Sequence, residues 1–144
     1  MSHYPFHCYV EAQAQVEGPV TLVPADAPSL GSAPPPEFGG PGGLWSPEDL
    51  LVAASVDCFV LTFRAIARAS KYTWSRLACK ADGRLDHEEG ITRFSSITIH
   101  ATLFIPTGCD PARGEVLLEK AEKKCLVMNS LKLTATLDAQ VVTA

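Results

Sequence analysis

The chain has 144 residues, of which 47% are hydrophobic and 19% are charged. This length suffices for one domain with its own core, and we expect a single domain over residues 1–144. The net charge of −4 argues against a nucleic-acid partner. No uninterrupted apolar run approaches the roughly 18 residues of a membrane span, and no signal sequence is visible at the N-terminus, so we expect a cytoplasmic protein.

The charges divide unevenly along the chain. Residues 1–63 contain seven acids and no Lys or Arg, for a net −7, whereas residues 64–144 contain twelve bases and nine acids, for a net +3. Segments of opposite charge attract each other, within one chain or between two. Chance combined with solvation explains the division equally well.

The N-terminal part is expected to form a short β-hairpin followed by a long loop. Alternation from Tyr9 onward predicts a strand within residues 4–17, and Val20–Val23 is expected to return beside it after the turn at Gly18-Pro19. In residues 24–43, eleven of twenty positions are Pro or Gly, which indicates a loop. A loop of this length in a compact domain is usually functional or disordered.

A first helix is expected from Ser46 to about Ser70. Ser46 is a favourable N-cap, Pro47 fits the first turn, and Glu48 and Asp49 suit the positive end of the helix dipole. Apolar residues recur at helical spacing and are expected to form the buried face: Leu51, Ala54, Cys58, Leu61 and Ala65.

The remainder of the chain predicts a long hairpin, a helix and a last strand. Residues 72–88 and 92–105 alternate on either side of a turn. Asp110 and Pro111 start a second helix, which is expected to run to about Met128, and residues 131–142 alternate again. The resulting order, β-β-α-β-β-α-β, indicates an α+β fold with antiparallel sheets and two main helices.

Two of the five cysteines form the best candidate site. Cys58 and Cys125 are 67 positions apart on separate predicted helices, a placement that suggests a redox pair. A thiolate that reduces a peroxide becomes a sulfenic acid, and a second thiol within reach converts this to a disulfide. A single free cysteine more often only fills space in a core. Nothing around the other three, Cys8, Cys79 and Cys109, argues for more than that.

Glu48 is the third candidate residue. It lies ten positions before Cys58, about 15 Å along a helix axis, so the two cannot meet within one helix. A shared site would take Glu48 from one chain and Cys58 from another, which points to an intertwined dimer. Alternatively, Glu48 only stabilises the helix N-terminus. There is no C-x-x-C or H-x-x-H pair and no phosphate-binding loop, so we expect no metal and no cofactor.

Two stretches resemble the OsmC/Ohr family of thiol-dependent peroxidases: G-G-L-W-S-P-E-D-L-L-V-A-A-S-V-D-C-F at 42–59 and A-E-K-K-C-L-V-M-N-S-L at 121–131. The resemblance implies an intertwined homodimer with two sites at its interface. It also implies that Cys58 attacks an organic hydroperoxide and that Cys125 resolves the product as a Cys58–Cys125 disulfide. A thiol or dithiol would reduce this disulfide, in a role in oxidative-stress defence, and Glu48 would partner an arginine beside the reactive cysteine.

The chain departs from the family pattern at that arginine. The family arginine comes from the N-terminal region, and here no Lys or Arg precedes Arg64. Either the thiolate lacks its usual partner, or an arginine from the later hairpin takes its place. The second stretch, residues 121–131, also departs from the family pattern, at Leu126 and Met128. Two alternatives therefore stand beside the peroxidase: a binding or structural dimer with weak or no activity, and a different thiol enzyme on the same scaffold.

Overall fold

A computed structural model describes residues 4–144 of the chain. These fall into two compact units, Met1–Leu50 and Leu51–Ala144, which we describe one at a time. The expectation of a single domain stays a prediction.

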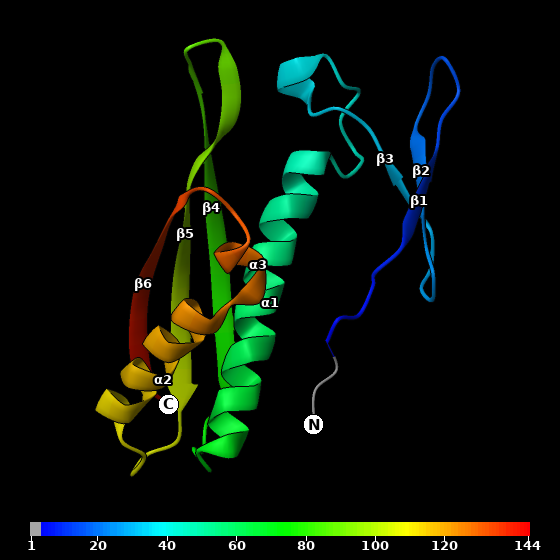
Figure 1. The fold of residues 1–144 in the computed structure, drawn as a ribbon. Helices are drawn as coiled ribbons and strands as arrows, with labels where there is room; N and C mark the ends of the chain where they lie inside the picture. The colour runs from blue at the N-terminus through cyan, green and yellow to red at the C-terminus, as the bar shows by residue number, and fades with distance from the viewer. Residues whose placement is uncertain (1–3) are drawn as a thin grey trace. The chain divides into compact units, whose positions relative to one another are not determined.

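The N-terminal unit contains a three-stranded antiparallel sheet in the order β1-β2-β3 (Figure 1). Its strands are β1 (Val10–Gln13), β2 (Val20–Pro24) and β3 (Leu30–Ser32). The first two confirm the predicted hairpin. The third was not predicted, because it lies inside the Pro- and Gly-rich segment. Pairing of Val20 with Ser32 and of Leu22 with Leu30 holds these residues extended despite the surrounding composition.

The rest of the Pro- and Gly-rich segment is tightly turned. A short 3-10 helix, η1 (Pro36–Phe38), ends at Gly39 in the left-handed conformation with φ 88°. A Cβ atom on Gly40 would lie 1.7 Å from the carbonyl oxygen of Pro34, so only glycine fits there. The segment is therefore an ordered turn, in contrast to the disordered alternative.

The long helix α1 (Pro47–Ala69) begins as predicted. The Asp49 backbone N–H donates to the Ser46 hydroxyl at 3.0 Å, and the Ser46 N–H donates to the Asp49 carboxylate at 3.1 Å. This reciprocal capping box satisfies backbone N–H groups that the helix itself leaves unpaired.

The predicted buried face of α1 is wrong. The buried residues are Ser55, Phe59, Phe63 and Ala67, whereas Leu61 is 49% exposed and Cys58 is only partly buried. Apolar residues lie on most sides of this helix, so their spacing does not single out one face. The two phenylalanines have the most apolar surface to bury, and they face the core.

By length and composition α1 would also pass as a membrane span, although the core helix of a soluble protein passes the same test. Asp57 and Arg64 interrupt the apolar residues of α1, so this helix contains no uninterrupted apolar run of that length.

The second unit is built on the sheet β4-β5-β6, with strands β4 (Arg76–Glu88), β5 (Ile91–Ile105) and β6 (Thr134–Thr143). The inward residues predicted on β5 are all buried: Ile97, Ile99, Ala101, Leu103 and Ile105. Strands β4 and β5 are antiparallel, as predicted. Strand β6, however, pairs with β5 in parallel. After β5 the chain returns along a helix, and β6 then starts beside the first half of β5. This is the crossover connection that parallel pairing requires.

That returning helix is α2 (Pro111–Lys124), capped by the Asp110 carboxylate, which accepts from the Ala112 N–H at 3.0 Å. It ends four residues earlier than predicted. Cys125 is extended, with φ −65° and ψ 105°, and a separate short helix, α3 (Leu126–Asn129), follows. The prediction that Cys125 lies inside a helix is therefore wrong. The helical periodicity of the sequence continues across this point. The helix nevertheless ends there, and the Cys125 side chain is completely buried.

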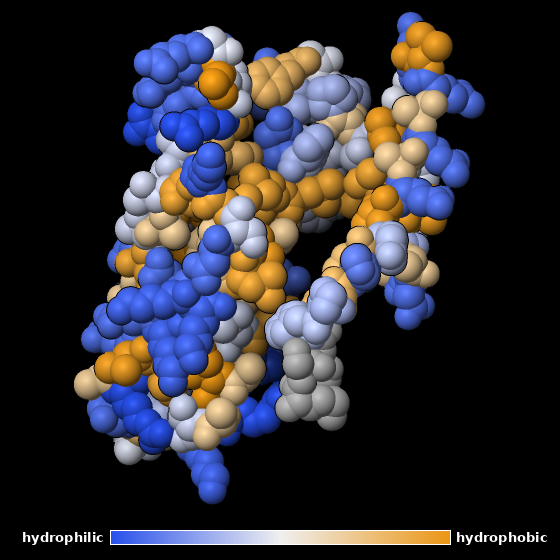
Figure 2. Space-filling model, viewed as in Figure 1, coloured by the Kyte–Doolittle hydropathy of each residue, from blue (hydrophilic) through white to orange (hydrophobic). Residues whose placement is uncertain are grey.

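Helices α1 and α2 lie on one face of the β4-β5-β6 sheet (Figure 1). Their buried side chains, including Phe59, Phe63, Leu117 and Leu118, form one core cluster with the inward residues of β5. Figure 2 shows hydrophilic side chains over the outward surface of α2, while hydrophobic patches remain in view along α1. A large part of the apolar surface of α1 is thus uncovered in a single chain.

Candidate thiol site

The structure brings Cys58 and Cys125 together. Cys58 lies in the middle of α1, and Cys125 lies at the junction of α2 and α3. Each side chain shifts the pKa of the other, with Cys125 acting as a hydrogen-bond donor that lowers the pKa of Cys58. Two thiols this close satisfy the first requirement of a redox pair, and the core between α1 and the α2–α3 junction holds both in place.

The surroundings of Cys58 favour its thiolate. Burial opposes ionisation, but hydrogen bonds outweigh it and hold the pKa of Cys58 below its ordinary value. The donors are the backbone N–H groups of Val127 and Leu126 at the start of α3 and the side chains of Cys125 and Thr62. The Thr62 hydroxyl oxygen lies 3.9 Å from the Cys58 sulfur, one helical turn away. Each of these donors is uncharged.

The surroundings of Cys125 have the opposite effect. Burial raises the pKa of Cys125 to about 11. The backbone N–H of Met128 partly offsets this effect, and the hydrogen bond and charge of Cys58 add to it. The Cys125 sulfur also lies 3.7 Å from the Ser55 carbonyl oxygen, which is a second acceptor for its single S–H group. The pair is therefore unequal, with one acidified thiol and one that stays protonated.

Access to the two sulfurs is unequal as well. Cys58 is partly exposed, whereas Cys125 is 0% exposed. The expectation from sequence placed Cys58 on the buried face of α1, and the structure corrects this. A reactant from solvent meets Cys58 first.

Glu48 belongs to the N-terminal unit, in the first turn of α1. Its Oε1 atom is buried and has no hydrogen-bond partner among the residues that the structure describes. Glu48 borders a cavity of about 240 Å³ with mostly apolar walls. Its relation to the two thiols stays a prediction.

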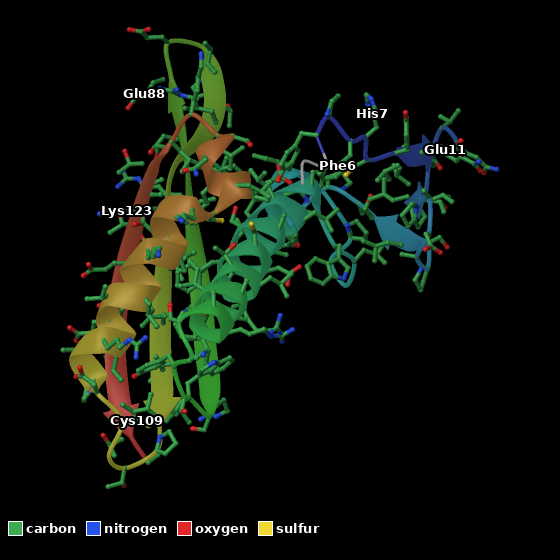
Figure 3. The ribbon with its side chains drawn as sticks, turned by 60° about the horizontal axis from the view of Figure 1, so that its bottom comes forward. Phe6, His7, Glu11, Glu88, Cys109 and Lys123 are labelled. Carbon is green, nitrogen blue, oxygen red and sulfur yellow. The ribbon has the colours of Figure 1, made fainter. Side chains whose placement is uncertain are left out.

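The other cysteines do not join this site. Cys8 is exposed, and burial in β4 raises the pKa of Cys79 to about 11. Cys109 precedes α2 and lies at the opposite end of that helix from Lys123 (Figure 3). Since α2 has 14 residues, Cys109 is about 20 Å along the helix axis from Cys125. Within residues 4–144 no cluster of three or more His, Cys, Asp or Glu side chains suits a metal ion.

Sequence reasoning missed the groups that acidify Cys58. Thr62 is four residues after Cys58, so helical spacing alone could have identified it. The N–H groups of Leu126 and Val127 are free to donate only because the helix is interrupted at Cys125. No sequence signal marked that break.

Fold and thiols together define an α+β protein with one partly exposed and one buried cysteine between its helices. The family model described as OsmC-like protein matches residues 40–140, and the chain belongs to this family.

Individual relatives are distant in sequence. The chain is 28% identical over 104 residues to peroxiredoxin OsmC of Escherichia coli, covering 72% of this chain and 71% of that protein. It is 23% identical over 101 residues to the uncharacterized protein YmaD of Bacillus subtilis, covering 68% and 67%.

Solved structures agree on the fold. An OsmC-like protein of unknown function from Vibrio cholerae superposes with a TM-score of 0.84 at 15% identity, over 95% of this chain and 99% of that one. An organic hydroperoxide resistance protein from Legionella pneumophila gives a TM-score of 0.74 at 24% identity, over 95% and 97%. The α+β fold predicted from sequence is therefore confirmed.

Proposed function

We propose that this protein is a cysteine-based peroxidase that reduces organic hydroperoxides in defence against oxidative stress. The observation that carries the proposal is the pairing of a partly exposed Cys58, whose pKa is lowered in part by Cys125, with a buried Cys125, whose pKa is raised to about 11. The names of relatives, peroxiredoxin and organic hydroperoxide resistance protein, support the same reaction class.

The proposed reaction has three steps. The Cys58 thiolate attacks the terminal oxygen of R–O–O–H, so that the S–O bond forms, the O–O bond breaks, and the alkoxide takes a proton to leave as the alcohol. The Cys125 thiol then attacks the sulfenic acid, which releases water and forms the disulfide. An external thiol or dithiol reduces the disulfide by exchange and is itself oxidised.

We further propose that the protein acts as an intertwined homodimer, in which Glu48 of one chain joins the thiols of the other. The uncovered apolar surface of α1 supports this, since Leu61 is 49% exposed within a single chain. The unpartnered Glu48 oxygen supports it too, because a buried acceptor without a donor is costly. Any Lys or Arg that completes such a site would come from residues 64–144.

The test is consumption of cumene hydroperoxide with a dithiol reductant. Cys58→Ser is expected to abolish turnover. Cys125→Ser is expected to allow one stoichiometric reaction and to leave a sulfenic acid on Cys58 that a dimedone probe traps. Cys109→Ser is the matched control, since this cysteine lies at the far end of α2. Full activity in Cys58→Ser refutes the proposal.

The second candidate is a binding or structural dimer with the same fold. Two observations favour it: the donors that lower the pKa of Cys58 are all uncharged, and no Lys or Arg precedes Arg64. This candidate predicts that equimolar hydroperoxide leaves both thiols reduced, as counted by mass spectrometry after alkylation. A Cys58–Cys125 disulfide within minutes would exclude it.

A further inference from the structure

We propose that Cys109 is a site of covalent modification by small acidic thiols, which it holds as a mixed disulfide in a cavity shared with Lys71 and Arg113. The site lies in the second unit, between the end of α1 and the start of α2. It is separate from the Cys58–Cys125 pair, and the inference does not depend on the proposed peroxidase function.

The cavity forms where two helix ends meet. Figure 1 shows the end of α1 and the turn before α2 at the same end of this unit. The cavity has a volume of about 190 Å³ and is lined by Lys71, Tyr72, Thr73, Cys109, Asp110 and Arg113. Typical small-molecule sites have at least roughly 300 Å³. A cavity of this size therefore admits only a compact group, such as the substituent of a low-molecular-weight thiol.

Arg113 is held in position beside this cavity. Its guanidinium donates to the Ser70 carbonyl oxygen and lies 5.8 Å from the centre of the Tyr72 ring. Tyr72 is itself fixed, because it is 8% exposed and its hydroxyl donates to the Asp110 carbonyl oxygen at 2.8 Å. A guanidinium has five N–H groups, so Arg113 retains donors for a carboxylate of the incoming molecule.

The charges of the lining favour an anion. Lys71 and Arg113 contribute two positive charges, against one carboxylate, that of Asp110. The Asp110 carboxylate accepts from the Ala112 N–H at 3.0 Å and is thus directed toward the helix that it caps. Lys71 is in the left-handed conformation, with φ 55°. Glycine adopts this conformation readily, so the charge at position 71 can be removed without straining the backbone.

The chemistry is a thiol–disulfide exchange with a low-molecular-weight disulfide R–S–S–R. The Cys109 thiol loses its proton, and its sulfur attacks one sulfur of the disulfide. A new S–S bond forms between Cys109 and one R–S group while the original S–S bond breaks. The other R–S⁻ leaves and takes up a proton. Where R carries a carboxylate, Lys71 and Arg113 attract the disulfide as it arrives, so acidic disulfides should react faster than neutral or basic ones.

The experiment compares three disulfides of similar length. Dithiodipropionate carries a carboxylate at each end, cystamine carries an ammonium, and hydroxyethyl disulfide carries a neutral hydroxyl. Each reacts with Cys58→Ser/Cys125→Ser protein, which lacks the competing pair, and peptide mapping by mass spectrometry gives the rate at each remaining cysteine. Cys8 is the internal control, because it is exposed and residues 1–63 contain no Lys or Arg.

The readout is the ratio of the acidic to the neutral rate, which cancels differences in the reactivity of the thiol itself. At Cys109 this ratio should be roughly threefold to tenfold, since each exposed charge pair contributes a modest attraction. Cystamine should react more slowly than the neutral disulfide. The ratio should fall toward one at high salt, because salt screens exposed charges. At Cys8 the acidic disulfide should have no advantage.

Variants locate the preference. Lys71→Gly and Arg113→Gln should each lower the ratio at Cys109, and the two together should abolish it. Arg113→Lys, which keeps the charge, should retain part of it. Lys123→Gln is the matched control, because it removes a cation of the same helix at the opposite end (Figure 3) and should leave the ratio unchanged.

Equal ratios at Cys109 and Cys8 overturn the proposal, as does a Cys109 that stays unmodified while Cys8 reacts. A preference that persists in Lys71→Gly/Arg113→Gln protein overturns it too, because the attraction then arises elsewhere. Circular dichroism checks that each variant is folded. Should Arg113→Gln unfold, Lys71→Gly decides alone, and an unchanged ratio in that variant refutes the proposal.

Discussion

Replacing Gly114 by alanine tests the packing of α2 against the rest of its unit. Gly114 is buried in the second turn of α2, and an alanine Cβ there would lie 2.7 Å from the Tyr72 hydroxyl oxygen and 3.1 Å from the Leu103 Cδ2 atom. Tyr72 cannot yield freely, because it is 8% exposed and its hydroxyl donates to the Asp110 carbonyl at 2.8 Å.

Two effects of Gly114→Ala oppose each other. Alanine improves helix propensity by up to about 1 kcal/mol. Overpacking a filled core costs about 1–3 kcal/mol, and displacement of the Tyr72 hydroxyl adds about 0.5–1.5 kcal/mol for its hydrogen bond. Steric strain therefore wins, and we expect a net loss of about 1–3 kcal/mol in the free energy of unfolding.

The Tyr72→Phe background should reverse the outcome. Without the hydroxyl, the closest contact disappears and the terminal methyl of Leu103 needs to shift only slightly, so Gly114→Ala should be neutral or mildly stabilising. Urea unfolding followed by circular dichroism on the four proteins gives the coupling energy, which should be at least about 1 kcal/mol. Equal effects of Gly114→Ala in both backgrounds would refute this account of the packing.

Three further predictions concern the thiols and the start of α1. Cys125→Ala should raise the pKa of Cys58, because it removes a hydrogen-bond donor, and Cys125→Ser should raise it less; the pH dependence of iodoacetamide alkylation measures both, and a downward shift would contradict the donor role. Stability should fall as pH rises from 9 to about 11, because Cys79 and Cys125 each ionise near 9 when unfolded but near 11 when folded. At pH 11 the share of Cys79 in this loss is at most roughly 2–3 kcal/mol, so Cys79→Val should reduce the fall by that share, and a denaturation profile that matches wild type would show that Cys79 does not contribute. Ser46→Ala should cost about 1 kcal/mol by thermal unfolding, since it removes half of the capping box; an unchanged melting temperature would mean that the cap contributes nothing.

Local chemistry made part of the fold predictable. Ser46 and Asp110 cap their helices as their positions indicated, because an N-cap depends only on the residues beside it. The inward residues of β5 followed directly from their alternation. The parallel direction of β6 depends instead on where the chain returns after α2, which alternation within a strand does not encode.

The two cysteines of the candidate thiol site could be selected from the sequence, but their electrostatics could not. Cys58 and Cys125 stand out in the sequence, and in the structure each shifts the pKa of the other; their catalytic role stays a prediction. The two thiols differ in pKa because backbone N–H groups of α3 donate to Cys58 and because Cys125 is buried. Both features follow from the interruption of the helix at Cys125, inside a stretch with helical periodicity. The face of α1 that is buried was likewise undetermined by sequence, because a helix that is apolar on most sides leaves tertiary packing to choose.

The position of the two thiols makes the stability of the protein depend on its redox state. A Cys58–Cys125 disulfide would link α1 to the α2–α3 junction, enclose β4, β5 and α2 in one covalent loop, and leave β6 outside it. A loop of this size removes enough freedom from the unfolded chain to be worth about 4 kcal/mol in the chain-entropy model. The resting and oxidised forms would then differ in resistance to heat and proteolysis, and the reductant would regenerate the less stable form in every cycle.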